Sequence, residues 1–331
     1  MPSPKIVAVT RIIPDAGMAL LHETEAAGEI ELRVWEQDSP PNPDELAALL
    51  HGADGAITLV TDAITADLLD QEPQLKVVSN FAVGYDNIDA DAATARGVAV
   101  CNTPGVLTET TADFAFALMM AAARRVVEGA DYVRAGKWTT WGPTLLLGRD
   151  LHGATLGIIG FGRIGKEMAK RARGFDVTIL AYDEYQDAAA AAELGVSYVD
   201  LDELLAQSDF VTLHCALTDE TRHLIGQREL DLMKPEAILI NASRGPVVDT
   251  DALTNALREK TIFAAALDVT DPEPLPADHP LIGMSNCLVV PHIASASVTT
   301  RAKMATLAVQ NCLAVIRGQT PPHCVNPEVL I

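Results

Sequence analysis

The chain has 331 residues, 49% of them hydrophobic, and a formal net charge of −21 at pH 7. This length predicts two domains, and the acidic charge would repel a polyanion, which excludes nucleic acid as an expected partner. The five cysteines are scattered without a CxxC pair, so we expect neither a disulfide framework nor a metal site. The N-terminal stretch "MPSPKIVAVTR" lacks the features of a signal peptide, and no apolar run approaches the roughly 20 residues of a membrane span. We therefore expect a cytoplasmic protein with no membrane segment.

Short β-branched runs alternate with helix-compatible segments in the first hundred residues. The predicted strands are 5–10, 31–35, 55–61, 75–80 and 98–102. Alternation of this kind predicts a parallel sheet covered by helices on both faces.

A long apolar helix is expected after Pro104 and Gly105, which mark a junction. Thr110 and Asp113 have the spacing of a capping box at its start. Because the following turns are apolar on all sides, this helix is predicted to be buried at a domain or subunit boundary.

A second alternating series fills the rest of the chain. Its predicted strands are 154–160, 177–183, 210–215, 237–242, 263–268 and 287–291, and a long amphipathic helix is expected over 298–317. The predicted fold class is therefore α/β, with two doubly wound, Rossmann-like domains built on parallel sheets.

The segment "GIIGFGRIG" carries a G-x-G-x-x-G pattern at Gly160, Gly162 and Gly165, between an apolar strand and a helix. In this context Gly160 permits a tight turn, Gly162 lets the backbone approach a pyrophosphate, and Gly165 lets helix and strand pack closely. The helix N-terminus offers N–H groups and partial positive charge to the anion. The alternative, a glycine turn without a ligand, fits the surrounding pattern less well.

Asp183 ends the strand that follows this helix, where it is expected to accept hydrogen bonds from the adenosine ribose. A 2′-phosphate beside this carboxylate would be repelled, and residues 184–187 supply no cation. The sequence therefore predicts NAD as cofactor, with NADH preferred over NADPH.

Three polar residues follow successive strands of the second series: Arg244, Glu273 and His292. Ligands bind outside the carboxyl ends of strands in open α/β sheets, so we expect these side chains to form a catalytic set. Taken singly, each residue also fits an ordinary structural or surface role. His214 lies at a strand end too, but its neighbour Cys215 is better placed to line an adenosine pocket.

With these residues in view, the chain resembles the D-isomer-specific 2-hydroxyacid dehydrogenases of the glyoxylate/hydroxypyruvate reductase type. The resemblance covers nearly the whole chain. It is carried by "FAVGYDNIDADAATARGVAVCNTPGVLTETTADFAFALMMAAAR", "LGIIGFGRIG", "LMKPEAILINASRGPVVD", "ALDVTDPEP" and "VPHIASAS".

The resemblance implies a discontinuous substrate domain, residues 1–101 and 294–331, with a NAD-binding Rossmann domain at 102–293 inserted in it. It implies that Arg244 pairs with the substrate carboxylate and that His292 exchanges a proton with the carbonyl oxygen. Glu273 would orient and charge the imidazole, and backbone N–H groups around Val83 and Gly84 would hold the carboxylate.

The resemblance also implies a homodimer, since Trp141 matches an aromatic that some relatives place across a dimer interface. Cofactor contacts are expected beside the pyrophosphate and the nicotinamide ring as well as at the ribose. The expected cofactor-binding residues are Thr108, Gly160, Gly162, Arg163, Ile164, Gly165, Asp183, Cys215, Ala242, Arg244, Asp268 and His292.

Several functions remain open within and beyond this family. Glyoxylate and hydroxypyruvate are the leading substrates, with 2-ketogluconate or a phosphoglycerate-type substrate as alternatives. A third class, an NADH-sensing corepressor-like protein, would keep the Arg–Glu–His set without turnover, and oxidation of an inorganic oxyanion such as phosphite is a further alternative.

Overall fold

The structure is a computed structural model and describes residues 3–330. It divides into two compact units. Unit 1 combines the chain up to Leu107 with the chain from Ala296 onward, and unit 2 is Thr108–Ser295. Both boundaries fall a few residues later than the domain boundaries expected from the sequence. No helix among residues 3–330 is long and apolar enough to span a membrane.

Unit 1 is built on a five-stranded sheet in which every neighbouring pair is parallel, with the order β2-β1-β3-β4-β5. The central strands β3 and β4 are fully buried along their length, which explains their apolar composition. The strands are β1 (Lys5–Val9), β2 (Ile30–Val34), β3 (Gly55–Thr58), β4 (Val77–Asn80) and β5 (Ala99–Cys101).

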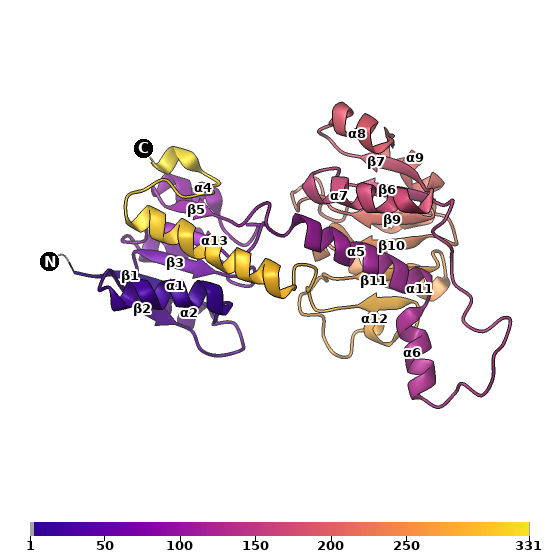
Figure 1. Cartoon of the computed structure of the whole chain (residues 1–331), viewed down its shortest axis with the longest axis horizontal. Coiled ribbons are helices and arrows are strands. Elements are labelled where there is room, and N and C mark those ends of the chain that lie inside the picture. The colour runs from indigo at the N-terminus through magenta and orange to yellow at the C-terminus, as the bar shows by residue number, and fades with distance from the viewer. Residues whose placement is uncertain (1–2, 331) are drawn as a thin grey trace. The chain divides into compact units, whose positions relative to one another are not determined.

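The helices of unit 1 include one from the far end of the chain. They are α1 (Asp15–Ala26), α2 (Pro43–Leu50), α3 (Ala66–Gln71), α4 (Ala90–Ala95) and α13 (Val298–Ile316), with a short 3₁₀ helix, η3 (Pro327–Leu330). Helix α13 packs beside α1 over β3 and β4 (Figure 1), and the Ser79 hydroxyl donates to the Ala308 carbonyl at 2.8 Å. The last long helix of the chain therefore covers part of the first sheet.

Unit 2 has a seven-stranded parallel sheet with the order β12-β11-β10-β9-β6-β7-β8. The strand order reverses between β6 and β9, so the loops after these strands diverge and leave room for a ligand. The sequence did not predict β8, a three-residue edge strand. The strands are β6 (Thr155–Ile159), β7 (Thr178–Tyr182), β8 (Val196–Tyr198), β9 (Phe210–Leu213), β10 (Ile238–Asn241), β11 (Ala264–Leu267) and β12 (Cys287–Val289).

Two helices of unit 2 precede its first strand, and the others connect its parallel strands. They are α5 (Thr108–Ala123), α6 (Val126–Arg134), α7 (Arg163–Ala172), α8 (Ala188–Leu194), α9 (Leu201–Gln207), α10 (Gln227–Leu232), α11 (Thr250–Glu259) and α12 (Pro280–Gly283), with 3₁₀ turns η1 (Arg173–Phe175) and η2 (Gly245–Val247). The predicted parallel α/β fold class is thus confirmed in both units.

Helix α5 differs from its prediction in two respects. It begins at Thr108, so Thr110 lies inside the first turn and the expected capping box is wrong. Asp113 instead pairs with Arg171 of α7, with 2.6 Å between carboxylate and guanidinium Nε. The helix is also buried on one face only, and Asp113 lies on the exposed side.

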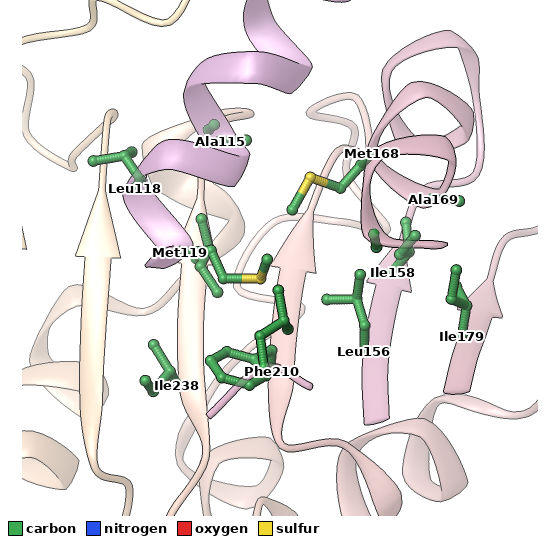
Figure 2. Close-up of a cluster of buried hydrophobic side chains, with 14 of the residues drawn as sticks. Ala115, Leu118, Met119, Leu156, Ile158, Met168, Ala169, Ile179, Phe210 and Ile238 are labelled. Carbon is green, nitrogen blue, oxygen red and sulfur yellow. The ribbon is translucent and has the colours of Figure 1, made fainter. Parts of the chain in front are cut away.

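The buried face of α5 joins α7 in a core over one side of the unit 2 sheet (Figure 2). Met119 of α5 and Met168 of α7 are completely buried, and they lie over Leu156, Ile158 and the Phe210 ring from the strands below. This packing fixes where β6 ends and α7 begins, and hence the position of the glycine loop.

Candidate active site

The loop after β6 needs glycine for steric reasons that the structure makes explicit. Gly160 has φ +90°, and a Cβ there would overlap the backbone N of Cys215. A Cβ on Gly165 would overlap the carbonyl oxygen of Gly160, so α7 lies directly against its own loop. A Cβ on Gly162, in contrast, would meet nothing within 4 Å.

The open space at Gly162 lies at the N-terminus of α7, a ten-residue helix. Gly162 is its N-cap and supplies no side-chain cap, and Gly162 and Arg163 are both exposed. The first-turn N–H groups are therefore open to an anion, and the helix dipole favours negative charge there. These features fit the pyrophosphate of a dinucleotide.

Asp183 follows β7 and lies beside this loop. Its carboxylate accepts from the Phe161 N–H at 2.6 Å and the Tyr185 N–H at 2.9 Å. The same neighbourhood holds a cation that the local sequence did not reveal, because Lys166 of α7 forms an ion pair with Asp187 at 2.5 Å. The Lys166 ammonium holds the pKa of Asp187 below its usual range.

The two residues after β9, His214 and Cys215, are partly buried. Burial lowers the pKa of His214 to about 4, and its Nε2 lies 2.9 Å from the Thr212 hydroxyl. Its Nδ1 has no hydrogen-bond partner among residues 3–330. Burial also raises the pKa of Cys215 to about 11, so that thiol stays protonated at neutral pH. These are the properties of a neutral, partly buried histidine and an unreactive thiol.

The three polar residues singled out in the sequence follow three adjacent strands of the unit 2 sheet. Arg244 comes after β10, Glu273 lies in the loop after β11, and His292 comes after β12. The structure brings two of them into direct contact, with 2.6 Å between His292 Nδ1 and Glu273 Oε1. Both side chains are about one-third exposed and thus accessible to a ligand.

Asp268 holds the backbone that carries His292. His292 has φ +50°, a left-handed conformation that a non-glycine residue adopts only when its surroundings impose it. Its N–H donates to the Asp268 carbonyl at 2.8 Å, and the buried Asp268 carboxylate accepts from Ile293 N (2.7 Å) and Ala294 N (2.9 Å). Burial raises the pKa of this carboxyl group, against the effect of the two amides.

Glu273 stays ionised although it is partly buried. Burial raises the pKa of Glu273, but the hydrogen bond and charge of His292, a hydrogen bond from the Thr270 N–H and the charge of Arg244 together bring it below its ordinary value. A permanent carboxylate on Nδ1 leaves Nε2 as the ring nitrogen that faces a ligand. The site can therefore supply one proton from an oriented imidazole beside a cation.

The sequence did not reveal the contact that joins the Arg244 and Glu273 loops. A Cβ on Gly245 would overlap the Thr270 carbonyl oxygen, so the two loops touch through their backbones. The Thr250 hydroxyl, at the start of α11, donates to the Asp271 carbonyl at 2.7 Å and is a second link to the loop that carries Glu273. The sequence "GP" that follows Arg244 is the one local signal of this close approach.

The remaining predicted residues occupy several places. Thr108 is the first residue of α5, and Ala242 is buried directly after β10. Val83 and Gly84 lie in unit 1, in the turn after β4. Trp141 is 78% exposed in the segment after α6, where Trp138 is exposed as well.

Comparisons with known proteins agree with this geometry. The sequence profile of the D-isomer specific 2-hydroxyacid dehydrogenase, NAD binding domain, matches residues 116–294. The glyoxylate reductase of Korarchaeum cryptofilum is 50% identical over 325 residues, which is 98% of this chain and 96% of that protein. The glyoxylate reductase of Thermococcus litoralis is 47% identical over 328 residues, which is 98% and 97% of the two chains.

Solved structures agree over the same length. A protein of Thermus thermophilus has a TM-score of 0.88 and 46% identity, covering 97% of this chain and 99% of that one. An NADPH-dependent glyoxylate/hydroxypyruvate reductase of Sinorhizobium meliloti, solved with NADP and malonate, has a TM-score of 0.85 and 32% identity over 98% and 97% of the two chains. The chain therefore belongs to the D-isomer-specific 2-hydroxyacid dehydrogenases, oxidoreductases that act on the CH–OH group of a 2-hydroxy acid with a nicotinamide cofactor.

Proposed function

We propose that this enzyme reduces a small 2-oxo acid, glyoxylate or hydroxypyruvate, with NADH, and that unit 2 binds the cofactor while unit 1 binds the substrate. The observation that carries the proposal is the 2.6 Å contact between His292 and Glu273 on the sheet edge that also bears Arg244 and the glycine loop. The glyoxylate reductase identity of relatives at 44–50% supports the choice of substrate.

The proton chemistry follows from the orientation of the imidazole. With Nδ1 held by Glu273, His292 presents Nε2 and donates its proton to the carbonyl oxygen as the 2-oxo acid is reduced. The carboxylate of Glu273 stabilises the imidazolium before transfer and fixes the ring. Arg244 pairs with the substrate carboxylate and polarises the carbonyl, because its guanidinium can engage two oxygens. In the oxidative direction His292 acts as the base.

The nicotinamide dinucleotide supplies or accepts the hydride when bound. Gly160, Gly162 and Gly165 would hold its pyrophosphate, flanked by Arg163 and Ile164, with Asp183 at the ribose and Cys215 by the adenosine. Ala242, Asp268 and Thr108 would lie toward the nicotinamide end, together with Arg244 and His292. The open space at Gly162 and the uncapped start of α7 support this arrangement.

The preference for NADH rests on the negative charge of Asp183. Lys166 does not offset that charge, because its ammonium is already paired with Asp187. Asp183→Ala should reduce the ratio of kcat/KM with NADH to kcat/KM with NADPH by about tenfold or more, since the repulsion of a 2′-phosphate is removed. An unchanged ratio would contradict the role of Asp183.

A homodimer is proposed through the apolar surface of α6 and the segment after it. Val126, Val133, Trp138, Trp141 and Leu147 are each more than half exposed there, and exposed apolar side chains gathered in one segment are typical of an interaction surface. Light scattering on the parent and on Trp141→Ala checks the proposal. A parent that is monomeric at micromolar concentration would contradict it.

The experiment that tests the function is a set of initial rates with glyoxylate, hydroxypyruvate, pyruvate and 2-ketogluconate, each with NADH and with NADPH. We expect the highest kcat/KM with glyoxylate or hydroxypyruvate and NADH. Preference for 2-ketogluconate, or for a phosphoglycerate-type substrate added to the panel, would change the substrate. NADH binding without turnover of any substrate would instead favour a sensor.

A further inference from the structure

The turn after β4 has three successive carbonyl groups that each accept a hydrogen bond. The Ala82 carbonyl accepts from the Thr103 N–H at 2.8 Å. The Val83 carbonyl accepts from Asn102 Nδ2 at 2.7 Å, and the Gly84 carbonyl accepts from Asn80 Nδ2 at 2.9 Å. Two of these three donors are asparagine side chains, so the chain uses specific residues to orient this backbone.

Fixing a carbonyl also fixes the next N–H group. The peptide unit is planar and trans, so the N–H of each following residue points away from the carbonyl before it. The N–H groups of Val83, Gly84 and Tyr85 are thus turned away from the residues that hold the carbonyls. Within residues 3–330, the Val83 and Gly84 N–H groups donate no hydrogen bond. Successive N–H groups presented in this way form an anion-binding concavity.

The two asparagines are themselves fixed. Asn80 is fully buried, its Oδ1 accepts from the Thr58 hydroxyl at 3.1 Å, and its Nδ2 also donates to Asn87 Oδ1 at 3.0 Å. Asn87 in turn donates to the carbonyls of Leu59 (3.0 Å) and Asp62 (2.8 Å). A buried network with its partners satisfied holds one geometry, because each broken bond leaves an unpaired polar group.

Asn102 has a separate support from the last helix. Its backbone carbonyl accepts from Asn311 Nδ2 of α13 at 2.9 Å, and Asn311 Oδ1 accepts from the His323 N–H at 3.0 Å. The side chain of Asn102 is therefore placed by β5 and α13 together, independently of the Asn80 network.

We propose that Asn80 and Asn102 are positioning residues that present the Val83 and Gly84 N–H groups to the carboxylate of the substrate. The inference rests on the proposed role of those two N–H groups, and it names the residues that orient them. A purely structural role is the alternative, in which the asparagines only stabilise the turn.

The test is steady-state kinetics of Asn102→Ala with glyoxylate, together with the inhibition constant of oxamate, a non-reducible carboxylate analogue. Losing an interaction that is equal in ground state and transition state raises KM and leaves kcat unchanged. We expect KM for glyoxylate and the oxamate constant to rise together by about tenfold, as for a loosened charge-assisted hydrogen bond, with kcat within about twofold. The dissociation constant of NADH should not change.

Asn326→Ala is the matched control. Asn326 is a buried asparagine of the same unit whose side chain bonds Val100 N, Thr94 Oγ1 and Val98 O, away from the turn after β4. The Asn326→Ala substitution should lower the unfolding temperature and leave KM for glyoxylate unchanged. If Asn102→Ala folds poorly, Asn102→Ser serves instead, since its side chain is too short to reach the Val83 carbonyl.

Three results would overturn the proposal. They are an unchanged KM in an active Asn102 variant, a loss of kcat without a change in KM, and equal effects of the Asn102 and Asn326 variants. In each case the parent still reduces glyoxylate, so the proposed function stands and only the positioning role fails. A parent without turnover of any 2-oxo acid would overturn both.

Discussion

The two parallel sheets of this chain both end in loops at their carboxyl edges, but the loops offer different chemistry. The edge of unit 2 presents charged side chains, with Glu273 on His292 and the charge of Arg244 nearby. The turn after β4 in unit 1 presents backbone N–H groups, oriented by Asn80 and Asn102. We propose that one edge moves a proton and that the other holds an anion.

This difference teaches which parts of a reaction need which kind of group. Proton transfer requires a side chain with a suitable pKa, so it depends on one residue and its partner. We propose that fixed dipoles, oriented by a buried network, share the binding of the carboxylate with the charge of Arg244. Substitutions of His292 or Glu273 should therefore change kcat, and substitutions of Asn80 or Asn102 should change KM.

The largest effect is expected for His292→Ala. Removing the proton donor should lower kcat for glyoxylate reduction by about a thousandfold, within the range of general acid catalysis. NADH binding, measured by fluorescence, should persist. His22→Ala removes a histidine that is 60% exposed in unit 1 and should retain full activity. Full activity in the His292 variant would end its assignment as the acid.

A smaller effect is expected for Glu273→Gln, which keeps the shape of the side chain and removes its charge. Because the pKa of Glu273 lies below its ordinary value, its carboxylate is ionised across the neutral range and pairs as an anion with Nδ1 of His292. Without this charge kcat/KM at pH 7.5 should fall by roughly ten- to a hundredfold, because the imidazole loses the carboxylate that holds its ring.

Steady-state kinetics at pH 7.5 check this expectation. Glu72→Gln is the control, since Glu72 is a buried carboxylate 3.4 Å from His51 in unit 1. An unchanged kcat/KM in Glu273→Gln would mean that Glu273 does not act on His292.

Gly162→Ala separates cofactor binding from folding. Its φ of −77° suits alanine and a Cβ would meet no protein atom, so the unfolding temperature should stay unchanged. A methyl group in the space proposed for the pyrophosphate should raise the NADH dissociation constant by about tenfold, or 1.4 kcal/mol. Gly174→Ala, also in open space, should change neither quantity. Unchanged NADH affinity in Gly162→Ala would place the pyrophosphate elsewhere.

The last effect concerns the stability of the fold and depends on His214. With a folded pKa of about 4 and an ordinary value of 6.5, the unfolded chain binds a proton between these pH values that the folded chain cannot. The free energy of unfolding therefore falls as pH drops from 6.5 toward 4, by about 2 kcal/mol between pH 7 and pH 5 from this group.

Urea unfolding of His214→Asn at pH 7 and pH 5 measures this contribution. The variant should lose less stability than the parent on acidification. His152→Asn, which removes a histidine that is 77% exposed in the same unit, should behave as the parent does. Equal acid sensitivity in the parent and His214→Asn would contradict a buried neutral imidazole.

The sequence predicted the fold class because short apolar strands and glycine turns are local signals. Strand β8 was missed because its three residues, VSY, form no apolar run, unlike those of the predicted three-residue edge strands β5 and β12. The capping box at Thr110 was wrong because the helix starts at Thr108, nearly one turn earlier than an N-cap at Thr110 would place it.

The features of the candidate site also differ in how far the sequence predicts them. Arg244, Glu273 and His292 could be singled out because each lies shortly after the end of a predicted strand. The ion pair of Lys166 with Asp187 joins two different elements, and the bonds from Asn80 and Asn102 end on carbonyl groups. Such contacts depend on three-dimensional proximity that no local pattern contains.

The most direct measurement compares His292→Ala and Asn102→Ala in one assay, with kcat and KM for glyoxylate determined at saturating NADH. We expect the first variant to lose kcat by about a thousandfold and the second to raise KM by about tenfold while keeping kcat. If both variants lost kcat alone, or both raised KM alone, the division between a proton-transferring edge and an anion-holding edge would be contradicted.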